Sequence, residues 1–370
     1  MSGHFKELEP ARRLQISSVI PAFFRDNDDI ARLESLGEGN INDTYLIRFS
    51  QRAPVVLQRI NDRVFPVPET VADNVALVTA HLASHRSEKT GEWSGYRFPE
   101  SLSAIDGKSH FRDDNGAVWR MLSYVENSIG HQVVTHPAQA NDVGRILGCF
   151  HQFLSDMDLS LLSDPLPGFH DLARYRQAYQ QAVIGHGRSS SEALDYCVEM
   201  AESRIEVPTL AERCAQEDIA NRVIHGDPKC DNFLFRADSK RGMSMIDLDT
   251  VSAGPLVQDL GDCLRSVCNP AGEKSRLGVC FDVDFCRRLL GGYREYGVLS
   301  EAEANLIFHS VRLLTYELGV RFLTDYLEND RYFKVVDKRE NLLRAVVQFT
   351  LLESIEEQRE VIEAIVADLS

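Results

Sequence analysis

The residues best suited to chemistry lie in the stretch His-Gly-Asp-Pro-Lys-Cys-Asp-Asn at 225–232. Asp227 stands five positions before Asn232, and Asp247 follows fifteen positions after Asn232, within Ile-Asp-Leu-Asp. Phosphoryl transfer needs little covalent chemistry from a protein, which must position the acceptor hydroxyl, accept its proton and hold Mg²⁺ on the phosphates. A carboxylate, an amide and a second carboxylate in this order predict that reaction.

Each side chain of this pattern suits one of those tasks. Asp227 is the predicted base, and Lys229 is predicted to supply positive charge near the γ-phosphate. Asn232 and Asp247 are the predicted Mg²⁺ ligands, because Mg²⁺ prefers oxygen donors and takes only one or two of them from a protein. Taken singly, His225 is more often a buried histidine that fixes a turn, and an Asp is more often a turn or cap residue. The joint pattern favours the catalytic interpretation.

The same spacing occurs in the catalytic loop of protein kinases, where the base Asp also precedes its Asn by five residues and a metal-binding Asp follows. This sequence departs from protein kinases at Gly226, where they have Arg, and at Leu248-Asp249, where they have Phe-Gly. In this form it resembles the aminoglycoside phosphotransferase and choline kinase superfamily. The resemblance implies ATP and Mg²⁺ as cofactors.

The elements that must position these residues fall into a β-rich first part and a helical second part. Residues 29–60 alternate strands and turns, with three strands; a helix is predicted over 69–85, and two more strands within 101–112 and 116–127. Helical periodicity then dominates over 141–155, 172–184, 191–203, 282–297, 301–328 and 341–367, with short strand-like runs within 222–250. We therefore predict an α+β, bilobal, protein-kinase-like fold, with a nucleotide-binding lobe at 1–125 and a catalytic and substrate-binding lobe at 126–370.

The predicted nucleotide site begins with the loop 36–42, Leu-Gly-Glu-Gly-Asn-Ile-Asn. Gly37 and Gly39 let backbone N–H groups approach phosphates, with Asn42 at the end of the loop, although paired glycines also make ordinary hairpin turns. The lysine that related kinases carry on the third strand is absent, since Gln58 and Arg59 occupy its place. Strand alternation sends these two side chains to opposite faces, so only one of them can face ATP.

The run Met-Leu-Ser-Tyr-Val-Glu at 121–126 is the predicted hinge of the nucleotide site. In this interpretation the backbone groups of Ser123 and Val125 form hydrogen bonds with adenine. The plainer interpretation of the same run is an edge strand.

Several segments together are similar to a narrower family, the bacterial N-acetylhexosamine 1-kinases. They are GEGNINDTYLI, VLQRINDRVFP, VWRMLSYVEN, IDLDTVSAGPLVQDLGDCLRS and LLTYELGVRFLTDYLENDRYF, so the likeness covers nearly the whole chain. That family also has Gln in place of the strand lysine. The sequence differs from it at Asn40, where the family has His, and at Pro228 and Cys230. The resemblance implies phosphorylation of the anomeric hydroxyl of GlcNAc or GalNAc.

The resemblance also implies which residues hold the sugar. Asp227 deprotonates the anomeric hydroxyl, and the sugar ligands are Lys229, Arg321, Asp325 and Tyr326. From the residues alone, Glu317, Arg321 and Asp325 lie at i, i+4 and i+8 on one face of the helix predicted over 301–328, which is usually a surface ion-pair ladder. Both interpretations stay open at the level of the sequence.

The charge balance bears on partners and location. The chain carries 40 Lys and Arg against 56 Asp and Glu, a formal net charge of −16 that disfavours nucleic acid and anionic membranes as partners. No apolar run approaches the roughly 18–20 residues that span a bilayer, and MSGHFKELEPARR lacks the apolar core of a signal peptide, so we expect a cytoplasmic location. We expect the eight scattered cysteines to be reduced thiols and the partners to be a sugar and ATP, in a monomer or a homodimer.

Two alternatives to the sugar kinase stay open. The same fold can phosphorylate another hydroxyl, such as that of another sugar, an aminoglycoside or a choline-like alcohol. A non-catalytic nucleotide-binding or scaffolding protein would keep the fold without the chemistry, but the joint presence of Asp227, Asn232 and Asp247 argues against it.

Overall fold

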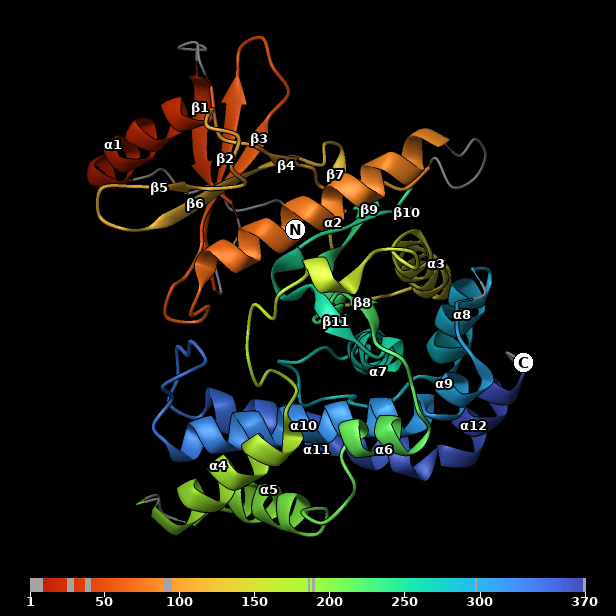
Figure 1. Ribbon diagram of the computed structural model, residues 1–370. Coiled ribbons are helices and arrows are strands. Elements are labelled where there is room, and N and C mark those ends of the chain that lie inside the picture. Colours follow the sequence, from red (N-terminus) through yellow and green to blue (C-terminus); the bar gives the residue numbers. More distant parts are fainter. Residues whose placement is uncertain are drawn as a thin grey trace. The chain divides into compact units, whose positions relative to one another are not determined.

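A computed structural model describes residues 9–24, 30–36, 41–88, 95–185, 187, 190–296 and 298–368. The chain divides into two compact units (Figure 1). The first comprises Met1–Gly130, Phe153–Pro167 and Leu234–Ala253, and the second comprises His131–Gln152, Gly168–Phe233 and Gly254–Ser370. The first unit is built on antiparallel strands and the second is mainly helical, which confirms the predicted α+β class. The lobe boundary near residue 125 stays a prediction.

The first unit is centred on an antiparallel sheet. Its strands are β1 (Ile30–Ser35), β2 (Asp43–Phe49), β3 (Val55–Arg59), β4 (Ser101–Leu102), β5 (Phe111–Arg112) and β6 (Val118–Ser123). They follow the order β1-β2-β3-β6-β4, and β5 pairs with β6. The register sets Thr44 opposite Gln58 and Gln58 opposite Arg120, so these three side chains form one row across the sheet. The strands predicted in this part of the sequence are confirmed.

Helices cover both faces of this sheet. The unpredicted helix α1 (Pro10–Val19) packs on the face that presents Leu57 and Trp119, and a short 3-10 helix at Ile20–Ala22 follows it. The predicted helix α2 (Pro68–Glu88) packs beside Val118, which strand alternation places on the opposite face. The central strands β3 and β6 are therefore covered on both faces, whereas the start of β1 is exposed.

A second, smaller sheet precedes the segment that carries Asp247. β7 (Ser128–Gly130), β9 (Phe233–Arg236) and β10 (Gly242–Met245) follow the order β10-β9-β7. After β10 the chain turns at Asp247 into a 3-10 helix at Leu248–Thr250. Other short elements are β8 (Arg222–Ile224), β11 (Ser252–Gly254) and 3-10 helices at Leu159–Leu161 and Cys230–Asn232. The strand-like runs predicted within 222–250 are thus confirmed as β8, β9 and β10.

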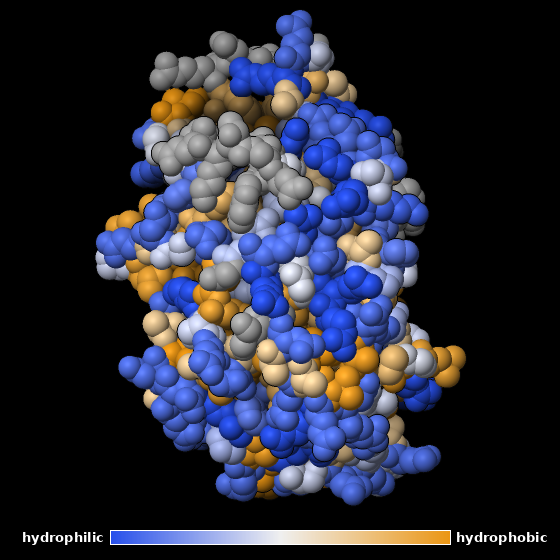
Figure 2. All heavy atoms as spheres, turned by 90° about the vertical axis from the view of Figure 1, so that its right-hand side faces the viewer, coloured by the Kyte–Doolittle hydropathy of each residue, from blue (hydrophilic) through white to orange (hydrophobic). Residues whose placement is uncertain are grey.

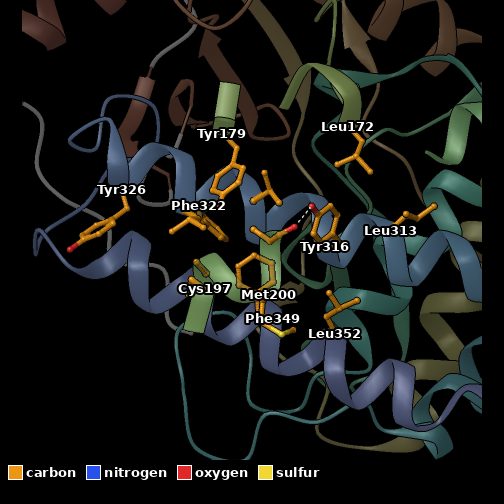
Figure 3. Packing of buried hydrophobic residues seen from close by; sticks show 14 of the residues in the cluster. Leu172, Tyr179, Cys197, Met200, Leu313, Tyr316, Phe322, Tyr326, Phe349 and Leu352 are labelled. Atoms are coloured by element: carbon orange, nitrogen blue, oxygen red, sulfur yellow. Dashed lines mark hydrogen bonds between the residues drawn. The ribbon is translucent and has the colours of Figure 1, made fainter. Parts of the chain in front are cut away.

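The second unit is arranged around α10 (Ile307–Leu327), which packs against α4 (Leu172–Gly185), α7 (Leu256–Val267) and α11 (Glu340–Glu357). Figure 3 shows the apolar cluster formed there, in which the hydroxyl of Tyr316 donates to the carbonyl oxygen of Ala201 at 2.8 Å. The remaining helices are α3 (Pro137–Phe153), α5 (Glu192–Glu202), α6 (Leu210–Gln216), α8 (Val283–Arg294), α9 (Glu301–Asn305) and α12 (Arg359–Ala367).

Several helical features of the second unit differ from the sequence-based expectation, including the unpredicted short helix α6. The helix predicted over 301–328 is interrupted at Leu306, between α9 and α10. The helix predicted over 341–367 is interrupted at Gln358, whose side chain donates to the carbonyl oxygen of Phe281 at 2.8 Å. The helix α7 was not predicted, although its apolar residues recur at helical spacing; its polar face, which carries charged side chains, is largely buried in the structure.

The described residues include a few exposed apolar side chains and eight cysteines. The face in Figure 2 is mainly hydrophilic, and exposed large apolar residues such as Leu161, Ile184 and Leu277 come from separate segments. Within the described ranges, no helix is long and apolar enough to cross a bilayer. All eight cysteines are free thiols, as predicted, and only Cys280 is exposed.

Candidate active site

The predicted catalytic loop lies in the second unit, between β8 and β9. The carboxylate of Asp227 pairs with the ammonium group of Lys229, and these side chains are 25% and 29% exposed. The side-chain amide of buried Asn232 donates to the carbonyl oxygen of Asp227 at 2.8 Å. The N–H of Asp227 donates to Nδ1 of His225 at 3.2 Å, which confirms His225 as a buried histidine that fixes a turn. The loop therefore brings together three of the predicted site residues.

A buried carboxylate on α7 holds this loop in place. Asp259 accepts hydrogen bonds from the backbone N–H groups of His225 at 2.6 Å and Gly226 at 2.9 Å. Its Oδ2 also lies 2.9 Å from Nε2 of His151, whose Nδ1 is 2.7 Å from the hydroxyl of Tyr293. The side chain of Asp259 has no exposed surface, so these donors are what compensates its desolvation. The sequence analysis missed Asp259 because it missed α7.

His170 supports the same loop. Its Nε2 donates to the carbonyl oxygen of Gly226 at 3.0 Å, and its Nδ1 lies 2.8 Å from the carboxylate of Glu317. Burial favours the neutral imidazole, yet the negative charge of Glu317 outweighs burial and raises the pKa of His170. The pair of His170 and Glu317 thus holds the residue that precedes Asp227.

Arg321, a predicted sugar ligand, lies among aromatic rings. Its guanidinium carbon is 4.9 Å from the ring centre of Tyr175 and 5.1 Å from that of Phe169. Tyr332 and Phe333 complete this group at 6.0 and 5.6 Å. Burial opposes the positive charge, yet the phenol of Tyr175 and the carboxylates of Glu317 and Asp227 raise the pKa of Arg321. The arginine is therefore a fixed cation within electrostatic reach of Asp227.

The other two predicted sugar ligands are built into the end of α10. The carboxylate of Asp325 accepts hydrogen bonds of 2.8–2.9 Å from the side chain of Asn341 and from the N–H groups of residues 331–333. Tyr326 is buried, and Figure 3 shows its hydroxyl directed away from the other labelled residues. Because Glu317 and Asp325 are both buried, the surface ion-pair ladder is a wrong interpretation of this row. Sugar binding by these residues stays a prediction.

In the first unit a buried arginine occupies the region where related kinases carry the strand lysine. Arg120 on β6 is 1% exposed. Its Nε and Nη2 donate to Oε1 of Gln58 at 3.0 and 2.8 Å, and Nη2 also pairs with the carboxylate of Asp249. The second carboxylate oxygen of Asp249 accepts from the side chain of Asn42, whose Oδ1 accepts the N–H of Asn61 at 2.9 Å. Two predicted nucleotide residues, Asn42 and Gln58, therefore converge on an ion pair that the sequence analysis missed.

Gln58 and Arg59 point to opposite faces of the sheet, as alternation predicts. The Nε2 of Gln58 donates to the hydroxyl of Thr44 at 3.1 Å, in the row that contains Arg120. Arg59 instead lies 3.4 Å from the carboxylate of Asp43 and is 35% exposed. Arg120, rather than Arg59, is therefore the buried cation on the face of Gln58.

Asp247, a predicted metal ligand, also belongs to the first unit. Its backbone is left-handed, with φ of +66°, a conformation that Asp tolerates better than most residues. Asp247 stands two residues before Asp249, the partner of Arg120. The ion pair therefore holds the turn that carries the predicted metal ligand.

The predicted hinge residues lie at the end of β6. Ser123 donates its N–H to the carbonyl oxygen of Glu100 at 2.9 Å, and its hydroxyl accepts the N–H of Glu100 at 2.8 Å. Val125 is buried. Gly37 and Gly39 lie outside the described residues, so the glycine loop stays a prediction, as do adenine contacts at Ser123 and Val125.

The chain matches a known protein family and resembles several solved structures. The model of a family described as "Phosphotransferase enzyme family" matches residues 32–296. An aminoglycoside phosphotransferase from Alicyclobacillus acidocaldarius has a TM-score of 0.62 at 13% identity, covering 97% of this chain and 98% of that chain. A microcompartment-associated aminopropanol kinase has a TM-score of 0.60 at 17% identity, with 96% of this chain and 99% of that chain covered. An amicoumacin kinase in complex with AMP-PNP and Ca²⁺ has a TM-score of 0.59 at 12% identity, with 95% of this chain and 94% of that chain covered. These likenesses confirm the predicted protein-kinase-like fold.

The buried pair Arg120–Asp249 yields a prediction about stability. Arg120→Met leaves a buried carboxylate without its cation, so we expect a loss of about 3–5 kcal/mol in the free energy of unfolding. The double variant Arg120→Met/Asp249→Asn should cost less than the sum of the two single variants. Arg59→Met is the matched control, because its half-exposed ion pair is worth at most about 1 kcal/mol. Urea unfolding measures the free energy of unfolding of Arg120→Met, Asp249→Asn, the double variant and Arg59→Met. If the loss in the double variant equals the sum of the two single losses, Arg120 and Asp249 do not interact as a pair.

His170 yields a prediction about pH. Because folding raises its pKa, the pair with Glu317 contributes its full stability below the unfolded value of about 6.5 and loses it as the pH rises through the folded pKa. His170→Asn is suitable, since residue 170 has a left-handed φ of +59° that Asn tolerates. The gap in unfolding free energy between wild type and variant should shrink from pH 6 to about pH 9. A gap that stays constant or widens contradicts this assignment.

Proposed function

Because this chain belongs to the phosphotransferase enzyme family, we propose that it transfers the γ-phosphoryl group of ATP to the anomeric hydroxyl of an N-acetylhexosamine. Family membership makes the chain a small-molecule phosphotransferase, and the nucleotide, the metal and the acceptor are the proposed part. The expected product is GlcNAc 1-phosphate or GalNAc 1-phosphate.

The observation that carries the proposal is the anchoring of the loop around Asp227. A general base acts when it is held within hydrogen-bond reach of the hydroxyl that it deprotonates. Asp259 holds the backbone before Asp227, and Asn232 binds the carbonyl oxygen of Asp227 itself. Lys229 places a positive charge beside the carboxylate, where it can attract phosphoryl oxygens. Asp227 is therefore the proposed base and Lys229 the proposed electrostatic partner.

The proposed metal ligands are Asn232 and Asp247. An amide oxygen and a carboxylate are hard oxygen donors, which fits Mg²⁺. The amide nitrogen of Asn232 is engaged with the carbonyl oxygen of Asp227, so the orientation of this amide is fixed and its oxygen is the atom left for a cation. Bound Mg²⁺ would neutralise charge on the phosphates. The relative with AMP-PNP and Ca²⁺ supports a nucleotide and a divalent cation in this proposal.

We assign to Arg120 the phosphate contact that the missing strand lysine makes elsewhere. Among the described residues, its Nη1 is buried and has no hydrogen-bond partner. A buried guanidinium N–H without a partner is costly, and a phosphate oxygen of ATP would satisfy it. Gln58 and Asp249 would then hold Arg120 in position for this contact, in the way that a strand lysine is held by its acidic partner.

The sugar is assigned to the surroundings of Arg321. The guanidinium can donate to hydroxyl groups and to the acetamide oxygen, and the rings of Tyr175 and Phe169 offer flat apolar surfaces for a pyranose. The carboxylate of Asp227 helps to raise the pKa of Arg321, so the two side chains lie close enough to contact one bound sugar in the second unit. Lys229, Asp325 and Tyr326 complete the proposed set.

Replacing the proposed base gives the most direct functional prediction. Asp227→Asn should lower kcat by about 10²–10⁴-fold with ATP binding roughly kept, because the amide cannot accept the hydroxyl proton. Asp231→Asn, four residues along and exposed, is the matched control and should keep most of the activity. The measurement is ADP release with GlcNAc, together with nucleotide affinity by calorimetry. Equal activity of Asp227→Asn and wild type would exclude this mechanism.

The same assay identifies the acceptor. Phosphorus NMR of the product should show phosphate on the anomeric carbon, and the product should no longer behave as a reducing sugar. Phosphate on another oxygen, or turnover only with an amino alcohol or aminoglycoside, would keep the small-molecule phosphotransferase and remove the 1-kinase.

A further inference from the structure

Two histidines and one aspartate form a compact cluster in the first unit, apart from every residue assigned above. His81 and His85 lie one turn apart on α2, and Asp156 lies in the turn that follows α3. Nε2 of His81 is 2.9 Å from Oδ1 of Asp156, and Nε2 of His85 is 3.2 Å from the same oxygen. The two Nε2 atoms are 3.2 Å apart. Three atoms that can bind a metal therefore form a nearly equilateral triangle.

The size of this triangle matches the coordination sphere of a transition ion. Zinc binds His nitrogen at about 2.0–2.1 Å and carboxylate oxygen at about 2.0–2.2 Å. Neighbouring ligand atoms around such an ion are about 3.0 Å apart in octahedral geometry and about 3.4 Å apart in tetrahedral geometry. The observed separations of 2.9, 3.2 and 3.2 Å need only small adjustments to accept an ion at its normal bond lengths.

The cluster is also chemically suited to a cation. Two imidazole nitrogens and a carboxylate oxygen lie within 3.2 Å of one another, and a single ion can bind all three once both Nε2 atoms are deprotonated. The ring of His85 stacks on Phe153 at 5.8 Å, which restricts its rotation.

Access and rigidity agree with a site that keeps an open position. The side chains of His81 and His85 are 25% and 22% exposed, and that of Asp156 is 64% exposed. An ion can reach the cluster from solvent, and a water molecule can fill the remaining position. The spacing of the histidines, i and i+4 on one helix, is the spacing that lets two side chains meet over one turn.

We propose that His81, His85 and Asp156 bind one divalent transition ion of the zinc class, which clamps the end of α2 to the segment 153–167. Imidazole ligands favour Zn²⁺ and its neighbours over Mg²⁺, which prefers oxygen. The site is therefore separate in chemistry from the metal of the proposed reaction. The proposal does not rest on that reaction.

The test is zinc binding by the full-length protein after chelation and dialysis. Saturating Mg²⁺ blocks the oxygen-rich site, and Zn²⁺ is then titrated by calorimetry. We expect one equivalent of tight binding and a rise in the melting temperature. His81→Gln and His85→Gln should each weaken Zn²⁺ binding at least about 10-fold, because replacing even a residue that only hydrogen-bonds to a metal ligand lowers metal affinity by about that factor. Co²⁺ should give the visible absorption of a site with nitrogen and oxygen ligands.

Two controls separate the cluster from other metal-binding groups. His110→Gln removes a histidine of the same unit that lies near Asp73 instead, and Cys280→Ser removes the one exposed thiol. Both variants should bind Zn²⁺ as wild type does. Asp156→Asn serves as the third cluster variant. Because the side chain of Asp156 is largely exposed, this substitution should change the stability of the fold little. Absence of stoichiometric Zn²⁺ binding, or binding that survives in all three cluster variants, would overturn the proposal.

Discussion

The buried carboxylate of Asp259 is the constraint on which the loop around Asp227 depends. A carboxylate with no exposed surface is stable only when donors surround it, and here the donors are the backbone of residues 225–226 and the ring of His151. The charge therefore has one geometry in which its desolvation is compensated, and that geometry fixes the residue that follows, Asp227. Helix α7 supplies the carboxylate, and its packing against α10 ties the loop to the core of the second unit.

In the first unit, the buried ion pair of Arg120 and Asp249 has a similar structural role. Arg120 and Asp249 are both buried, and Gln58 and Asn42 satisfy part of what each still needs. Arg120 has more donors than a lysine would have, and one of them, Nη1, has no hydrogen-bond partner among the described residues. Each unit thus carries a buried charge cluster that holds a turn bearing an acidic residue of the proposed reaction.

Much of the fold follows from local sequence patterns. The strands up to residue 60 are separated by turn residues, apolar residues recur at helical spacing in α2 and α10, and Gln58 and Arg59 obey strand alternation. The motif around Asp227 was found because spacing alone marks it. By contrast, Asp259 and Arg120 are charged residues that the fold buries, and their local sequence does not indicate which distant partners they contact. His170 and Asp156 contact residues that are far away in the sequence, and a single sequence does not reveal such contacts.

The central claim is that Asp227 receives the proton of an anomeric hydroxyl while Asn232 and Asp247 hold the metal of the nucleotide. A crystal structure with GlcNAc, Mg²⁺ and a non-hydrolysable ATP analogue tests this claim most directly. The account predicts the anomeric oxygen at about 2.6–3.2 Å from the carboxylate of Asp227, with the amide oxygen of Asn232 and the carboxylate of Asp247 on the metal. A different hydroxyl next to Asp227, or a metal bound without these two side chains, would contradict it.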